Sequence, residues 1–133
     1  MISFDDFKKV EITVGKILSA EKIPETDKLL KLSVDFGLKP APMVASGAGS
    51  PELSEGQNVL RAVDIRQIIS GISMYFPDPA VLVGKRCMFV TNLEPRTIRG
   101  LESNGMLFAV STEDGKFSLL EPNAEIPEGT RAK

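Results

Sequence analysis

Every second residue is apolar in several stretches of the chain, which is the pattern of half-buried β-strands. The clearest stretch is residues 30–36, LKLSVDF, which ends at Gly37. Residues 10–17, VEITVGKI, also alternate, but after Gly15 the apolar positions change from even to odd numbers. A glycine at which the inward face changes predicts a bulge or a sharp bend, by which small barrels turn a corner.

Four further apolar segments predict strands, at residues 66–72, 86–93, 105–111 and 117–122. Residues 78–85, DPAVLVGK, predict a short helix that ends at Gly84, and Ser3 followed by Asp6 predicts one helical turn near the start. Together they predict an all-β chain, a five-stranded OB-fold Greek-key barrel with a short helix between strands 3 and 4 and a C-terminal extension. Periodicity alone also allows another small barrel or a sandwich.

Residues 38–65 differ in composition from the rest of the chain. They are rich in proline, glycine and alanine, which is typical of loops, and residues 58–63, NVLRAV, predict a short strand at the end. So long a connection is uncommon inside a compact domain. We therefore expect an insertion at about 38–65, within a single domain that spans residues 1–133.

The composition fits a globular domain. The chain has 133 residues, of which 42% are apolar, and no apolar run approaches the ~20 residues that span a bilayer. The N-terminal sequence MISFDDFKKV has acids where a secretory signal would have a basic and then an apolar region. We expect a cytoplasmic protein with no membrane partner.

The sequence lacks several features that enzymes commonly use for catalysis. The sequence has no histidine, which removes the commonest general base and the commonest transition-metal ligand. Its single cysteine, Cys87, excludes an internal disulfide and lies in the apolar run CMFV, so we interpret it as a core residue. The sequence also has no clustered carboxylates and no phosphate-binding glycine motif. We expect no catalytic site, no metal and no cofactor.

Charge is distributed unevenly along the chain. The net charge of −2 and the isoelectric point near 5.2 argue against a general nucleic-acid binder. Residues 66–109 nevertheless contain five Lys/Arg and three Asp/Glu, which makes them the positive part of the chain. They contain a very polar connection, residues 92–110, NLEPRTIRGLESNGMLFAV. Arginine donors match phosphate, Asn and Ser reach ribose or base edges, and glycines let a backbone approach closely. This connection is therefore predicted to be a binding loop between the last two barrel strands.

Six segments, in order, resemble the tRNA-binding domain family. This family occurs at the C-terminus of many methionyl-tRNA synthetases and as small free-standing dimeric tRNA-binding proteins. The segments are FKKVEITVGKI, TDKLLKLSVDFG, RQIISGI, LVGK, NLEPRTIRGLESNGMLFA and LLEPNAEIPEGTR. They cover all of the chain except about 38–65. Any one of them would be weak evidence, whereas six in family order are strong evidence.

The resemblance implies an OB-fold barrel that binds tRNA by its shape, forms a homodimer and has no catalytic site. The start, ISFDDF, is similar to that of the methionyl-tRNA synthetase appendage, so a synthetase catalytic domain is a further expected partner. With the resemblance, seven residues become candidate RNA contacts: Lys28, Lys31, Asn92, Arg96, Arg99, Ser103 and Met106.

The chain departs from the family pattern at several positions. Glu94 and Thr97 stand where the family often has basic residues, which leaves the strength of RNA binding open. Ile23 and Thr26 replace a usual histidine and alanine. Residue type alone favours ordinary structural roles: an amide that caps its own turn, a surface pair of Glu94 with Arg96, and a methionine in the core. The main alternative function is that of a CsaA-type chaperone, which shares this fold and binds proteins.

Overall fold

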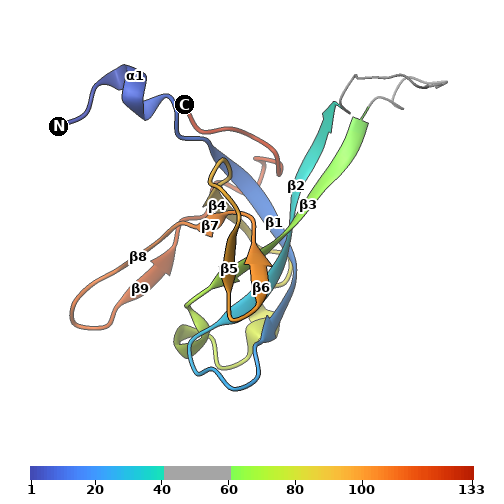
Figure 1. Ribbon diagram of the computed structural model, residues 1–133, viewed down its shortest axis with the longest axis vertical. Helices are drawn as coiled ribbons and strands as arrows, with labels where there is room; N and C mark the ends of the chain where they lie inside the picture. The colour runs from blue at the N-terminus through green and yellow to red at the C-terminus, as the bar shows by residue number, and fades with distance from the viewer. Residues whose placement is uncertain (41–60) are drawn as a thin grey trace.

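The computed structural model of the protein describes residues 1–40 and 61–133. Its elements, in chain order, are α1 (Phe4–Phe7), β1 (Ile12–Lys22), β2 (Leu30–Pro40), β3 (Arg61–Ser70), η3 (Ser73–Tyr75), η4 (Pro79–Leu82), β4 (Arg86–Val90), β5 (Arg96–Ile98), β6 (Leu101–Ser103), β7 (Met106–Leu107), β8 (Ala109–Ser111) and β9 (Phe117–Leu119). Five strands form one antiparallel sheet in the order β3-β2-β1-β4-β7, with the hairpins β5–β6 and β8–β9 beside it (Figure 1). The sheet curls into a half-barrel, which confirms the all-β prediction. The OB-fold label itself stays a prediction.

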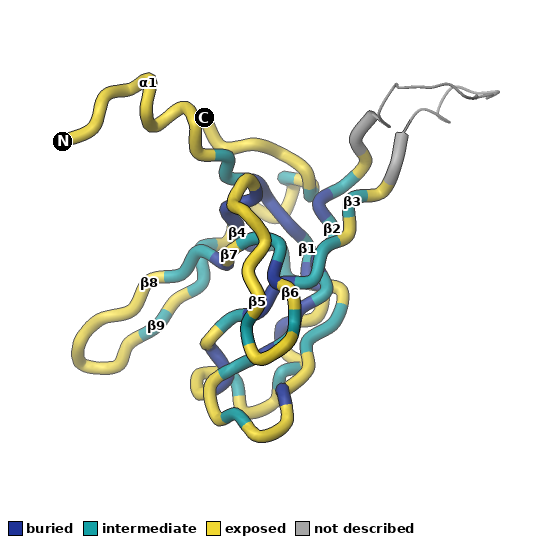
Figure 2. Tube along the Cα trace, viewed as in Figure 1, coloured by how far each residue is buried: buried dark blue, intermediate teal, exposed yellow. Residues whose placement is uncertain are grey.

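The core lies inside the curl of the sheet (Figure 2). Leu30, Leu32, Val34 and Phe36 of β2 are all buried, as their alternation predicted. They pack in one cluster with Ile17, Ile68, Ile72, Leu82, Cys87, Phe89 and Leu107. Each large aliphatic or aromatic side chain buried in this way stabilises the fold by about 1.5–3 kcal/mol. The half-barrel is thus held together mainly by apolar burial.

Cys87 confirms its expected place in this core. It is fully buried in β4, and burial raises the pKa of its thiol to about 12, with a further contribution from Glu121 that outweighs the opposing effect of Lys85. A thiol with so high a pKa stays protonated at neutral pH, so it is a poor nucleophile and a poor metal ligand.

Gly15 has a different role from the one predicted. The β1–β2 register shifts between Ile17 and Ser19, which leaves Leu18 as the extra residue of the bulge. At Gly15 a Cβ would lie 2.6 Å from the side chains of Val34 and Phe36. Gly15 is therefore required for close packing of β1 over the core, and the bend comes three residues later.

The helical segments are short. At the N-terminus, Ser3 Oγ accepts a hydrogen bond from the Asp6 amide (3.1 Å), which confirms the predicted cap of α1. Between β3 and β4 the expected helix is a 3-10 turn, η4, whose cap Asp78 accepts from the Ala80 amide, and a second 3-10 turn, η3, precedes it. In the described ranges, no helix is long and apolar enough to span a bilayer.

Strands β2 and β3 extend beyond the core as a two-stranded arm, at the upper right of Figure 1. Leu38 pairs with Val63 and Pro40 pairs with Arg61 across this arm. Residues 38–40 and 61–65, at the two ends of the expected insertion at 38–65, belong to β2 and β3, and the insertion itself stays a prediction. Its remaining part, 41–60, lies outside the described residues.

The C-terminal extension lies along β1. The Val14 amide donates to Thr130 O (2.9 Å), and the Gly129 amide donates to Val14 O (2.8 Å). Gly129, with a φ of +94°, also touches β2, where a Cβ would lie 2.7 Å from Phe36 O. The extension is thus bonded into the folded domain at its far end.

Candidate nucleic-acid interface

The polar connection forms the hairpin β5–β6. Arg96 pairs with Ser103, and Ile98 pairs with Leu101. The two residues at the tip, Arg99 and Gly100, both have left-handed backbones, with φ of 54° and 80°. Two such residues form the type I′ turn, whose twist matches that of the flanking strands. The connection is therefore an ordered hairpin, which holds its tip in a fixed place.

Arg96 and Arg99 are exposed on this hairpin. In residues 1–40 and 61–133 their guanidinium groups have no hydrogen-bond or ion-pair partner, so the surface pair of Arg96 with Glu94 does not form. Each guanidinium keeps its five N–H donors for solvent or a ligand.

Arg99 and Lys28 line one shallow depression on the surface. The rest of its lining comes from the loop between β1 and β2, residues 25–29. This loop is bonded to η3, since the Ser73 amide donates to Lys28 O (2.9 Å). Two predicted RNA contacts that are 71 positions apart in sequence thus meet at one place. Glu25 and Asp27 also lie there, so the depression carries charges of both signs.

Ser103 has a structural role that the sequence did not predict. It is buried, and its Oγ accepts a hydrogen bond from the Ile69 amide (3.0 Å) and donates to Gly105 O (3.2 Å). Next to it, the Asn104 amide donates to Gln67 O (2.9 Å). These bonds attach the β5–β6 hairpin to β3. The hydroxyl is occupied inside the protein, so in this structure it does not face a ligand.

Asn92 likewise uses its side chain inside the protein. Its Oδ1 accepts from the Glu11 amide (2.8 Å), and its Nδ2 donates to Lys9 O (2.5 Å). The amide therefore joins the end of β4 to the segment that enters β1. Residue type alone suggested that Asn92 caps its own turn, and the structure shows that it does not. Both polar atoms of its side chain already have partners within the protein.

Lys31 and Met106 lie on separate strands. Lys31 on β2 faces Glu21 on β1, and their charged atoms are 4.0 Å apart, an exposed pair that contributes little stability. Met106 on β7 pairs with Val90 and is exposed, so it is not the core residue that its type suggested. Lys28, Arg96 and Arg99 are thus the candidates whose charged groups are unpaired in the described part of the chain.

Arg66 is a residue that sequence reasoning missed. Its guanidinium forms a fork with the Asp64 carboxylate (3.1 and 3.2 Å), donates to Thr91 O (2.6 Å) and lies 5.3 Å from the centre of the Phe36 ring. Asp64 is a local partner on β3, whereas Phe36 on β2 and Thr91 at the end of β4 are distant in sequence, so no local pattern could have revealed the last two. Arg66 stabilises the join between strands and is not available as an RNA contact.

The residues in the described ranges contain no group of three or more side chains that could hold a metal ion. The hairpin region offers a fixed backbone with exposed cations. Such groups suit contacts to phosphate and ribose, which shape-dependent RNA recognition uses.

Comparison with known proteins identifies the family. The family model described as "Putative tRNA binding domain" matches residues 53–131. The methionine–tRNA ligase of Flavobacterium johnsoniae is 36% identical over 97% of this chain, and that of Methanospirillum hungatei is 39% identical over 99%. These matches span 14% and 16% of the ligases. They correspond to the tRNA-binding appendage in the C-terminal region and exclude the catalytic part.

Solved structures agree with this result. A methionyl-tRNA synthetase related protein from Pyrococcus horikoshii has a TM-score of 0.76 and 37% identity, and the match covers 100% of this chain and 98% of that one. The CsaA chaperone of Picrophilus torridus has a TM-score of 0.72 with 23% identity over the full length of both chains, a likeness of fold alone. Since the family model matches more than half of the chain, the protein belongs to the tRNA-binding domain family.

Proposed function

We propose that this chain is a non-catalytic module that binds tRNA by its shape and helps a methionyl-tRNA synthetase to capture its substrate. The observation that carries the proposal is the full-length likeness to the appendage of methionine–tRNA ligases. The geometry supports it, because Arg96, Arg99 and Lys28 present unpaired cations on a fixed hairpin and loop. We expect the module to work in the cytoplasm, either free or joined to a synthetase catalytic domain.

The proposed contact uses phosphate and ribose groups. Arginine on a rigid turn can present its fork to a phosphate at little entropic cost. Asn92 and Ser103 contribute indirectly, by holding the hairpin and the end of β4 in place. Glu25 and Asp27 beside Lys28 disfavour indiscriminate binding of polyanions.

A titration with bulk tRNA tests this function. Binding should weaken steeply with salt, by about 0.7–0.9 log units per phosphate contact for each tenfold rise in salt. Duplex RNA of the same length should compete poorly, because it lacks the folded shape. Equal affinity for tRNA and duplex RNA, or no dependence on salt, would contradict the proposal.

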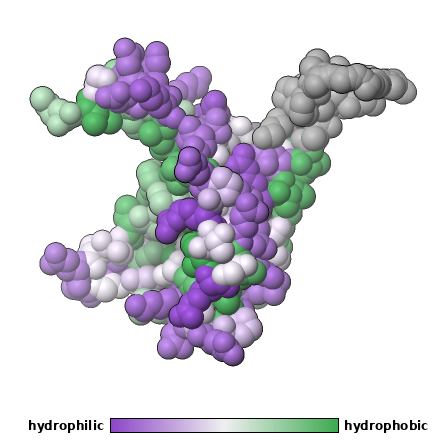
Figure 3. Space-filling view, in the orientation of Figure 1, coloured by the Kyte–Doolittle hydropathy of each residue, from purple (hydrophilic) through white to green (hydrophobic). Residues whose placement is uncertain are grey.

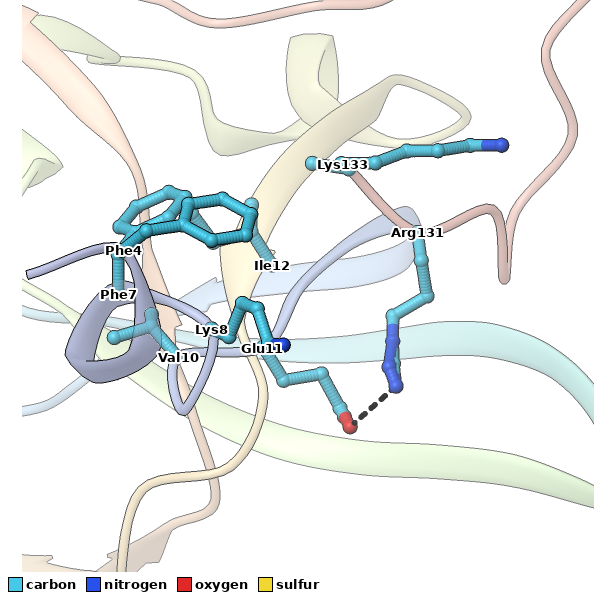
Figure 4. Close-up of a pocket in the computed structure, with 9 residues that line it drawn as sticks. Phe4, Phe7, Lys8, Val10, Glu11, Ile12, Arg131 and Lys133 are labelled. Carbon is cyan, nitrogen blue, oxygen red and sulfur yellow. Dashed lines mark ion pairs between the residues drawn. The ribbon is translucent and has the colours of Figure 1, made fainter.

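We also propose that the module is a homodimer. Phe4, Phe7 and Val10 are exposed around α1, where they line a pocket together with Ile12 and the C-terminal residues (Figure 4). Figure 3 shows apolar surface continuing into the recess between α1 and the β8–β9 hairpin. Apolar surface gathered in this way favours burial against a second copy.

A second candidate function is protein binding. The β2–β3 arm exposes Leu38, Val63 and Ile65 as a small apolar strip. A chaperone could use such a strip to hold an unfolded chain. Suppression of aggregation of a refolding client protein by this chain, and its loss in Val63→Ser/Ile65→Ser, would favour this candidate over tRNA binding.

A further inference from the structure

A group of three cations lies where β1 and β4 pair, apart from the β5–β6 hairpin. Lys16 on β1 stands directly opposite Arg86 on β4, and Lys85 comes immediately before Arg86. The backbone is fixed at this point, since the Ile17 amide donates to Lys85 O (2.9 Å). Like charges on paired positions destabilise a sheet unless something compensates them.

Acidic residues of the C-terminal extension provide that compensation. Arg86 Nε donates to Glu128 (2.9 Å), and Lys85 Nζ lies 3.7 Å from Glu121. The hydrogen bond from Arg86 lowers the pKa of the Glu128 carboxyl, with a smaller contribution from Lys16. The extension thus places two carboxylates on the three cations.

These ion pairs are accessible to solvent. The side chains of Lys85 and Glu121 are 37% and 44% exposed, and those of Arg86 and Glu128 are 33% and 24% exposed. The exposed pair of Lys85 with Glu121 contributes little to stability, so exchange of the Glu121 carboxylate for another anion costs little free energy. The pair of Arg86 with Glu128 is only partly exposed, so exchange of the Glu128 carboxylate costs more. Arg86 Nη1 also donates to Ala124 O (3.3 Å), which leaves further guanidinium donors unused.

We propose that Lys16, Lys85 and Arg86 form a second phosphate-binding surface for RNA, which Glu121 and Glu128 cover in the free protein. This inference rests on the proposed tRNA function. A folded RNA presents phosphates from several backbone segments, so a second contact surface suits recognition by shape. The carboxylates of the extension then compete with phosphate groups for these three cations, which limits the binding of polyanions that have low affinity for this surface.

The test is the double variant Glu121→Gln/Glu128→Gln, with tRNA affinity measured between about 50 and 200 mM salt. Its affinity at low salt should rise about fivefold, and its salt dependence should steepen by about one phosphate contact. The matched control is Asp5→Asn/Glu113→Gln, which changes net charge equally but at exposed positions away from this surface. Adding Arg86→Gln to the double variant should reverse the gain.

Equal changes in the double variant and its control, or no change in either, would overturn the inference. Glu121→Gln alone removes only an exposed pair, so it keeps the fold and should give a smaller rise in the same direction. No rise in that variant would also count against the inference. Arg99→Asn separates the proposed hairpin site from the proposed second surface. If the hairpin is an RNA site, this substitution weakens tRNA binding whether or not the extension covers the second surface. A parent chain without tRNA affinity would overturn both.

Discussion

Arg99 occupies a backbone position that glycine, asparagine and aspartate favour over other residues. Its φ of 54° lies in the left-handed region, where a side chain with Cβ is strained. An arginine retained there gives up some stability of the turn and gains a charged group at the tip of the hairpin. We propose that the guanidinium has a binding function that offsets this cost.

Arg99→Asn therefore separates binding from folding. Asn-Gly is a preferred pair for a type I′ turn, so the unfolding midpoint should stay the same or rise. Affinity for tRNA should fall by about tenfold to a hundredfold, since a hydrogen bond to a charged group contributes about 1.5–3 kcal/mol. The salt dependence should also become shallower by about one contact. Unchanged affinity and salt dependence would show that the hairpin tip is not the RNA site.

Ser103→Ala should act on stability first. The Ile69 amide would lose the Ser103 hydroxyl as its partner in a buried place, and an unsatisfied buried donor costs about 1–3 kcal/mol. Chemical denaturation should show this loss, and tRNA affinity measured well below the unfolding transition should change much less. A variant of full stability that cannot bind tRNA would restore Ser103 as a direct contact.

Gly15→Ala tests the packing of β1. A methyl group at this position would lie 2.6 Å from atoms of Val34 and Phe36 and 2.9 Å from Phe89. Overpacking of a dense core typically costs about 1–3 kcal/mol. We expect a clear fall in the unfolding midpoint, whereas Gly71→Ala, where nothing lies within 4 Å, should have little effect. Equal stability of both variants would mean that β1 can shift away from the core.

At the scale of elements, the β2–β3 arm shows how pairing continues beyond the core. Pro40 and Arg61 are cross-strand partners, so a two-residue turn can join them. Replacement of residues 41–60 by Asn-Gly should therefore leave a cooperative unfolding transition. The stability should be equal or higher, because loop closure costs only about 0.6 kcal/mol for each doubling of length. Loss of the cooperative transition in denaturant would show that residues 41–60 contribute to the core.

At the scale of the whole molecule, the apolar surface around α1 predicts self-association. Light scattering should give about twice the 14.4 kDa mass of one chain for the parent. Phe4→Ser/Phe7→Ser should give the mass of a single chain without a change in the strand signal in circular dichroism, since both rings are exposed in the single chain. Val63→Ser/Ile65→Ser, on the arm, should stay dimeric. The opposite pattern would place the interface on the arm.

Alternating positions let the sequence alone predict the all-β class and the buried face of β2. The cap at Ser3 and the location of Cys87 in the core were also predictable. These features depend on near neighbours along the chain. The family resemblance supplied the expectation of tRNA binding, and the comparisons confirmed the family.

Only the tertiary structure decided which candidate residues are free to bind. Ser103, Asn92 and Arg66 each make at least one hydrogen bond to a partner 25 or more positions away, and residue type cannot reveal such partners. The tertiary structure also places the β1 bulge at Leu18 and not at Gly15, where Phe36 and Phe89 pack closely over the glycine. The same folding brought Lys28 beside Arg99 and placed the acidic extension on Lys85 and Arg86. A local pattern fixes which face of a strand is apolar, whereas the partner of a polar group depends on how distant strands meet.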